Sequence, residues 1–175
     1  MASILRFDNW QNSDGTSIAT TDASGNISFA GSLGATAGVG KILQVVRATD
    51  STQRNTTSTS FTDITGLSVT ITPTSASSTI LVVLSGAMIL QSTTTGGSTQ
   101  ITDSSNVALS GAEAMEVQDV SANSLVSPVL VIGYDSPATT SAVTYKGRFR
   151  SKTGGGVSFI NSINTAQIFA LEVGA

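Results

Sequence analysis

The sequence predicts an all-β protein, an antiparallel β-sandwich or jelly roll preceded by an extended N-terminal β arm. Ser, Thr, Gly, Ala and Val fill most positions, and small β-branched and hydroxyl residues suit a pleated sheet. Short apolar runs recur between Thr/Ser/Gly loops, with no helical period. Charged residues make up only 11% of the 175 residues, and the mean hydropathy of +0.22 indicates a packed chain rather than a disordered one.

Residues 1–40 differ from the rest and are predicted to form the arm and a Gly-rich linker. Two turn signals, at Asp14-Gly15 and at 22–26, divide the arm into three short strands. These strands are expected at 6–11, 16–20 and 27–29. A ribbon this small cannot bury its apolar side chains against itself, so it needs another surface. The side chains expected to anchor it there are Ile4, Leu5, Phe7, Trp10, Ile18, Ile27 and Phe29. The alternative is an arm folded back on its own domain.

Residues 41–175 are predicted to form the sandwich. Its strands are expected at 42–48, 67–71, 79–88, 100–102, 114–120, 129–134, 143–150, 157–160 and 167–173. The segments 79–88 and 129–134 are apolar on both faces, which is typical of strands that are covered on both sides. One face of each would line the core, and the other would meet neighbouring subunits. The scarcity of charge also favours an obligate assembly. A homotrimer around a three-fold axis is preferred, and a symmetric dimer is the rival.

Composition argues against several classes of function. The net charge of −3 argues against nucleic-acid binding. The chain has no cysteine and no histidine, which removes thiol nucleophiles, thiolate metal sites and the commonest general base. The start of the sequence lacks a signal peptide, and the longest apolar run, 80–90, is interrupted and too short to span a bilayer. We therefore expect a non-enzymatic protein without cofactor or metal, made in the cytoplasm and not inserted in a membrane.

Three motifs resemble chemical sites but lack features that the chemistry needs. Segment 35–41 mimics a phosphate-binding loop, yet Ile42 follows the lysine where a Ser or Thr must reach magnesium. Segment 103–106 offers oxygen ligands for calcium without acid-rich spacing, so an Asx turn is expected. Three carboxylates lie close together and could suggest glycan hydrolysis: Glu113, Glu116 and Asp119. On a strand the first two point to opposite faces, so a solvated loop and strand edge is expected instead.

Four cations form a candidate docking stripe: Lys146, Arg148, Arg150 and Lys152. In a strand they share one face, opposite Tyr145 and Phe149. Such a stripe would dock on an acidic neighbour or on an anionic cell-surface sugar. The pattern favours the other interpretation, a solvated sheet face whose charges discourage edge-to-edge aggregation.

Several segments resemble a module of virion proteins from marine tailed phages. Those in the predicted sandwich are Lys41–Val46, Thr65–Ser78, Ile80–Val83 and Ala170–Val173. Segments 7–11 and 22–31 are similar to phage fibre and decoration proteins. The resemblance implies a structural subunit of a bacteriophage particle, a capsid decoration or fibre protein, with no catalytic motif to carry over. The arm would attach it to other proteins of the capsid, neck or tail, and the sandwich would oligomerise and project outward.

Such a protein would be made in the host cytoplasm and reside in the virion. The alternative function is a tail-fibre module that binds a host surface glycan through loops 91–100 and 135–141. Sugars usually stack on aromatic rings, and the neighbouring Tyr134 is the single ring available there, which weakens this hypothesis. A small hydrolase is the third hypothesis, and no motif in the sequence supports it.

Overall fold

The computed structural model describes residues 9–11, 13–29, 41–91, 96–118, 124–159 and 164–174. Within these ranges every regular element is a β-strand, and the strands pair antiparallel. The chain divides into two compact units, residues 1–39 and residues 40–175. The all-β prediction is therefore confirmed.

The N-terminal unit contains a small antiparallel sheet of strands β1 (Asn9–Gln11), β2 (Ser17–Thr21) and β3 (Ile27–Phe29) in that order. Its two turns form where the sequence predicts them. The Asp14 carboxylate accepts the backbone N–H of Thr16 at 2.9 Å, and the Asp22 carboxylate accepts the N–H groups of two residues in the second turn. Asx side chains favour such turns because they replace a backbone acceptor.

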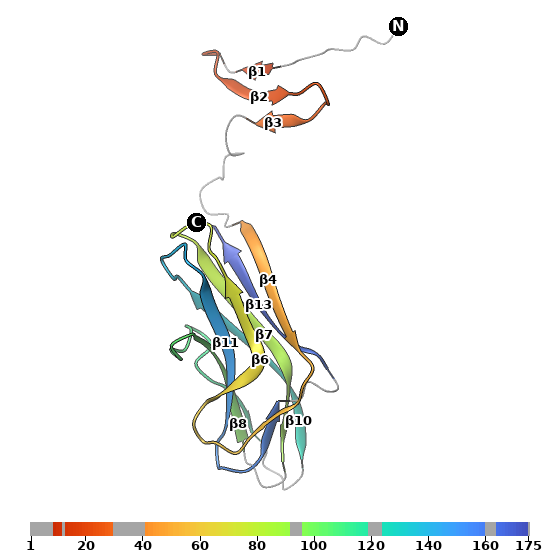
Figure 1. Cartoon of the computed structure of the whole chain (residues 1–175), viewed down its shortest axis with the longest axis vertical. Helices are drawn as coiled ribbons and strands as arrows, with labels where there is room; N and C mark the ends of the chain where they lie inside the picture. The colour runs from red at the N-terminus through yellow and green to blue at the C-terminus, as the bar shows by residue number, and fades with distance from the viewer. Residues whose placement is uncertain are drawn as a thin grey trace. The chain divides into compact units, whose positions relative to one another are not determined.

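The second unit is a sandwich of two sheets (Figure 1). Its strands are β4 (Ile42–Asp50), β5 (Arg54–Thr56), β6 (Thr62–Ile71), β7 (Thr79–Leu90), β8 (Gly96–Asp103), β9 (Met115–Gln118), β10 (Leu125–Asp135), β11 (Val143–Ser151), β12 (Val157–Phe159) and β13 (Ala166–Val173). The four-stranded sheet has the order β6-β11-β8-β9. The six-stranded sheet has the order β4-β13-β7-β12-β5, with β10 also paired to β7.

Strand β7 is the central strand of the six-stranded sheet and pairs with neighbours on both of its edges. Strand β10 pairs with β7 from Ile80 to Leu90. On the other edge, β13 pairs with the first half of β7 and β12 pairs with residues 88–90. Strands β4 and β5 continue the sheet beyond β13 and β12. The sheet is therefore four strands wide, with β10 along one edge.

The core lies between the two sheets and is formed by their inward-facing residues. Phe149 of β11 meets Phe159 of β12 edge to face, with ring centroids 6.3 Å apart. Gly147 in β11 leaves room for the Leu84 side chain from the opposite sheet, because a Cβ at position 147 would overlap the Leu84 Cδ1 atom. Close interdigitation of this kind is typical of sandwich cores.

Several strand predictions need correction. Strand β8 begins at Gly96, not at residue 100, so half of the predicted loop 91–100 is a buried strand. The segment Gly96–Thr99 lacks apolar side chains, and its burial comes from neighbours such as Met88, whose sulfur lies where a Gly97 side chain would be. Strand β5 was not predicted, because its short polar sequence shows no alternation.

Strand β10 was predicted to be covered on both sides, and in the single chain this is wrong. It is an edge strand that begins before Pro128, and its even-numbered residues are exposed. Proline is tolerated at this position because an edge strand does not need every backbone donor. The strand predicted at 114–120 is β9, Met115–Gln118, and residues 119–123 lie outside the described residues. The jelly-roll connection remains a prediction.

Candidate functional site

The outer face of the four-stranded sheet carries the candidate docking stripe. Lys146 and Arg148 lie on β11 and both contact Asp63 of β6, with N–O distances of 3.0 and 2.8 Å. Lys152, just beyond β11, contacts Glu116 of β9 at 2.9 Å. The predicted sharing of one face is confirmed for the strand residues, since their odd-numbered neighbours are buried.

Two carboxylates of the same chain, Asp63 and Glu116, offset half of the four positive charges of the stripe. Burial of Asp63 opposes its ionisation, but hydrogen bonds from Lys146 and Arg148 prevail and lower its pKa. A hydrogen bond from Lys152 likewise lowers the pKa of Glu116. The fourth cation, Arg150, lies 4.6 Å from the ring centre of Phe61. Cations that already contact acids or an aromatic ring of their own chain are less available to bind an anionic partner.

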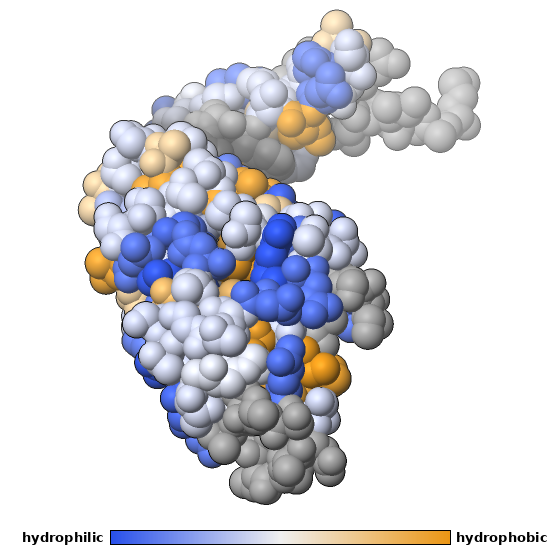
Figure 2. All heavy atoms as spheres, turned by 60° about the horizontal axis from the view of Figure 1, so that its bottom comes forward, coloured by the Kyte–Doolittle hydropathy of each residue, from blue (hydrophilic) through white to orange (hydrophobic). Residues whose placement is uncertain are grey.

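Figure 2 shows one face of the molecule. On the part that belongs to the sandwich, hydrophilic side chains form blue patches, and hydrophobic side chains occupy small areas. A mixed surface of this kind is typical of a part of the molecule that meets water.

The outer face of the six-stranded sheet is different. Paired residues in antiparallel strands share a face, so the strand registers define rows of side chains across the sheet. One row is Tyr134, Leu81, Leu171 and Val45, and the next is Ile132, Val83, Phe169 and Arg47. Together with Val126 and Leu130, the apolar members of these rows form a surface that we call the apolar face. Its nine residues are Val45, Leu81, Val83, Val126, Leu130, Ile132, Tyr134, Phe169 and Leu171.

Five side chains of the apolar face are exposed to solvent in the single chain. Its β10 side chains are exposed by 48% at Ile132 and by up to 57% at Val126. Val45 on β4 is also about half exposed. The charged residue in these two rows is Arg47. Its guanidinium carbon lies 5.6 Å from the centre of the Phe169 ring, and its Nε–H donates a hydrogen bond to the Gln167 side chain. Sequence reasoning found the β7 and β10 parts of this face but missed those on β4 and β13, although the run Ile168–Leu171 is apolar at every position.

A buried carboxylate, which the sequence analysis missed, joins three segments that lie far apart in the sequence. Glu172 of β13 accepts the backbone N–H and the hydroxyl of Thr74 at 2.8 and 2.7 Å, and the side-chain amide of Gln44 at 2.6 Å. Burial opposes ionisation of Glu172, but hydrogen bonding from Gln44 and Thr74 prevails and lowers its pKa to about 2. Because this carboxylate is satisfied within the fold, its role is structural.

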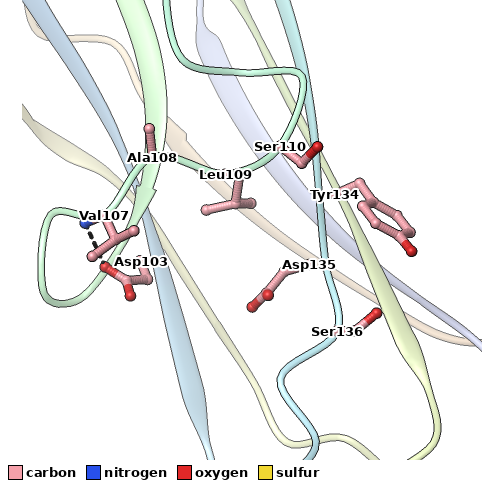
Figure 3. Close-up of a pocket in the computed structure, with 8 residues that line it drawn as sticks. All are labelled: Asp103, Val107, Ala108, Leu109, Ser110, Tyr134, Asp135 and Ser136. Atoms are coloured by element: carbon pink, nitrogen blue, oxygen red, sulfur yellow. Dashed lines mark hydrogen bonds between the residues drawn. The ribbon is translucent and has the colours of Figure 1, made fainter.

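A pocket of about 460 Å³ adjoins the end of β10 (Figure 3). It is lined by Asp103, Val107, Ala108, Leu109, Ser110, Tyr134, Asp135 and Ser136. Figure 3 shows that the Tyr134 ring points away from the two carboxylates, so it does not form a stacking platform beside them. Both acids serve local structure. Asp103 accepts the N–H groups of Ser105 and Val107, which confirms the predicted Asx turn.

Asp135 accepts the hydroxyl of Tyr145 at 2.8 Å. Burial of the tyrosine and this hydrogen bond raise the pKa of Tyr145 well above its ordinary value. The phenol therefore stays protonated and ties β11 to the end of β10. A fixed neutral donor of this kind is a structural feature rather than a catalytic base.

The other candidate residues are dispersed. In the N-terminal unit, Trp10 and Ile27 are exposed by 60% and 63%, and Ile18 by 49%. Phe29 ends β3, where its backbone pairs with Ala19. The predicted anchoring residues Ile4, Leu5 and Phe7 lie outside the described residues, as does Asp119.

The remaining chemical motifs show no convergence among the described residues. Glu113 accepts the backbone N–H of Gly111, and Glu116 is paired with Lys152. In the described ranges no three Asp, Glu, His or Cys side chains gather in a way that could hold a metal ion. Strand β4 begins at Ile42, directly after the phosphate-loop mimic, as predicted. No helix in the described part is long and apolar enough to cross a membrane.

The comparisons with known proteins add no family. No protein-family model and no curated protein matches this sequence.

Proposed function

We propose that this protein is a non-enzymatic structural subunit of a bacteriophage particle, either a capsid decoration protein or a fibre protein. It would be made in the host cytoplasm and reside in the virion. The proposal rests on the resemblance of several segments to phage virion proteins and on the way the chain distributes its apolar and charged side chains. The carboxylates described above serve turns, ion pairs and buried hydrogen bonds, which also suits a structural role.

The observation that carries the proposal is the exposed apolar content of the N-terminal unit. Trp10 and Ile27 share one side of the three-stranded sheet, because Trp10 pairs with Ala19 and Ile27 lies two residues from the Ala19 partner, Phe29. Large apolar side chains on a ribbon this small are typical of interface anchors. We propose that this unit is the arm that attaches the subunit to other virion proteins.

The sandwich would supply the assembly. A homotrimer with a jelly-roll connection is the form that we propose, with exposed loops directed away from the particle. Obligate subunits bury large apolar surfaces that a free monomer would leave in water. Two features disfavour the glycan-binding alternative. The Tyr134 ring turns away from the pocket acids, and three of the four cations of the candidate docking stripe contact acids of their own chain.

The test is to locate the protein on particles. An antibody raised against the purified chain should label the particles of the phage that encodes it in immunoelectron microscopy. The full-length variant Trp10→Ser/Ile27→Ser should fold and oligomerise but fail to join particles when it replaces the native chain. Thr20→Ser, on the opposite side of β2, is the matched control and should be incorporated normally. Unlabelled particles would contradict the proposed function.

A further inference from the structure

The two outer faces of the sandwich differ in polarity: one carries charged side chains and the other carries apolar ones. Outward-facing residues of a sandwich are usually polar, because they meet water. The four-stranded sheet follows this rule with the cross-strand ion pairs of Asp63 to Lys146 and Arg148. The six-stranded sheet does not follow it, because outward-facing residues of three adjacent strands, β10, β7 and β13, are apolar, as is Val45 of β4. A sheet face this apolar is typical of an interaction surface.

We infer that the apolar face packs against the same face of a second copy of this chain. The inference rests on the subunit role proposed above and names the surface and the partner. Its first support is charge. Arg47 is the charged residue in the two central rows, and it is already engaged by Phe169 and Gln167. Because Arg47 lies on the edge strand β4, its charge is at the rim of the face, and the apolar faces of neighbouring copies can meet around the three-fold axis proposed above.

The second support is area. Five side chains of the face, Val45, Val126, Leu130, Ile132 and Tyr134, are each about half exposed. A Val, Leu or Ile side chain carries roughly 60–120 Å² of apolar area and a tyrosine roughly 150–250 Å², so these five half-exposed side chains offer roughly 300 Å². Four partly exposed apolar neighbours and the polar side chains in the rows enlarge this area towards the roughly 800 Å² that one partner contributes to a standard stable interface.

The third support concerns the kind of contact. Strand β10 is an edge strand, and two such edges can join by strand addition. Pro128 lies inside β10 and has no backbone N–H, which interrupts the row of donors that strand addition uses. Ser110 also pairs with Tyr134 near the end of this edge. These features disfavour an edge-to-edge contact and leave the face as the surface for the second copy.

The first experiment measures the mass of the full chain by light scattering over a range of concentrations. We expect a stable multiple of 17.7 kDa. The Ile132→Asp variant places a charge in the middle of the face and should reduce the mass to that of a monomer. The matched control is Val107→Asp, because Val107 is an exposed apolar residue outside the face, at 63%. This control should keep the native mass.

A second measurement does not depend on disrupting the assembly. The chain has no cysteine, so Ile132→Cys introduces a single thiol on the face and Ser68→Cys introduces one on the charged sheet. With a short bis-maleimide cross-linker, the thiol at position 132 should link two copies at least about tenfold faster than the thiol at position 68. Native circular dichroism of each variant checks that its fold is intact.

The outcomes separate this inference from the proposed function. A monomeric wild-type chain overturns the inference, whether or not particles are labelled by the antibody. An oligomer that Ile132→Asp leaves unchanged, with equal cross-linking at positions 132 and 68, also overturns it, and the subunit role then stands on another surface. Loss of assembly in Ile132→Asp together with preferential cross-linking at position 132 supports the inference, even if the antibody finds no particle.

Discussion

Glu172 accepts two hydrogen bonds from a single residue, the backbone N–H and the side-chain hydroxyl of Thr74, which lies 98 positions earlier in the sequence. The carboxylate thereby ties the end of β13 to the loop between β6 and β7. Gln44 of β4 completes the cluster and also donates to the Thr72 carbonyl. Three segments that lie far apart in the sequence thus meet around one buried acid.

The first prediction concerns the pH dependence of stability. The pKa of Glu172 is lowered from 4.5 to about 2 in the folded chain. A group with a lowered folded pKa stabilises the fold above its unfolded pKa, and this contribution is lost as the pH falls from about 4.5 through about 2. Glu172→Gln should lower the free energy of unfolding at neutral pH and flatten its decline in acid.

Urea unfolding of wild type and variant between about pH 2 and pH 7 measures this difference. Glu113→Gln is the control, because Glu113 is exposed and accepts a local backbone N–H. Parallel curves for wild type and Glu172→Gln would show that the buried cluster does not contribute as argued.

The second prediction tests the contact between the two sheets. Gly147→Ala places a methyl group against the Leu84 side chain in the closed core. Overpacking of this kind typically costs about 1–3 kcal/mol of unfolding free energy. Chemical denaturation measures the loss. The double variant Gly147→Ala/Leu84→Val should lose less than the sum of the single variants, because the smaller side chain makes room. Strict additivity would argue against the contact.

The third prediction concerns the aromatic pair in the core. Phe159 is fully buried and meets Phe149 edge to face. Phe159→Ala should cost about 3–5 kcal/mol, through lost burial and a residual cavity. Val107→Ala removes apolar atoms from an exposed loop residue and should change stability by no more than about 0.5 kcal/mol. Equal effects in thermal or urea unfolding would mean that Phe159 does not lie in the core.

The fourth prediction concerns the ion pairs on the charged sheet. Asp63 contacts Lys146 and Arg148, but its side chain is 47% exposed. Partly exposed pairs contribute little, so Asp63→Asn should cost at most about 1 kcal/mol. The loss should shrink at high salt, because mobile ions screen the wild-type pairs. A cost of several kcal/mol that is independent of salt would show that these contacts are buried and structural.

The sequence predicted the class of the fold and the position of most strands. Alternation in 67–71 and the continuous apolar run of 79–88 lie within β6 and β7. Asp14-Gly15 and Asp22 form the predicted turns. Side-chain periodicity and turn chemistry are local properties, so they can be recognised without knowing which strands pair.

Other features have no local signal. Gly96–Thr99 forms a buried strand because Met88 and Val157 pack over it. The sequence did not show that β10 is an edge strand, since an apolar strand at an edge has the same sequence pattern as one at the centre of a sheet. The sequence also placed the cations of β11 on one face but did not identify Asp63 as their partner, because that pairing spans 83 and 85 positions.

By itself, then, the sequence determined that the chain forms antiparallel strands and which residues alternate between the two sides of each strand. It also determined that two segments, 79–88 and 129–134, are apolar on both sides. Only the tertiary structure decided which strands are neighbours, and so which side chains share a surface. The pairing of β10, β7, β13 and β4 collects their outward residues into the apolar face, while the pairing of β6, β11 and β8 collects charges on the other side. The physical reason is that a strand specifies its two faces through local backbone geometry, whereas its neighbours are selected by long-range packing of the whole core.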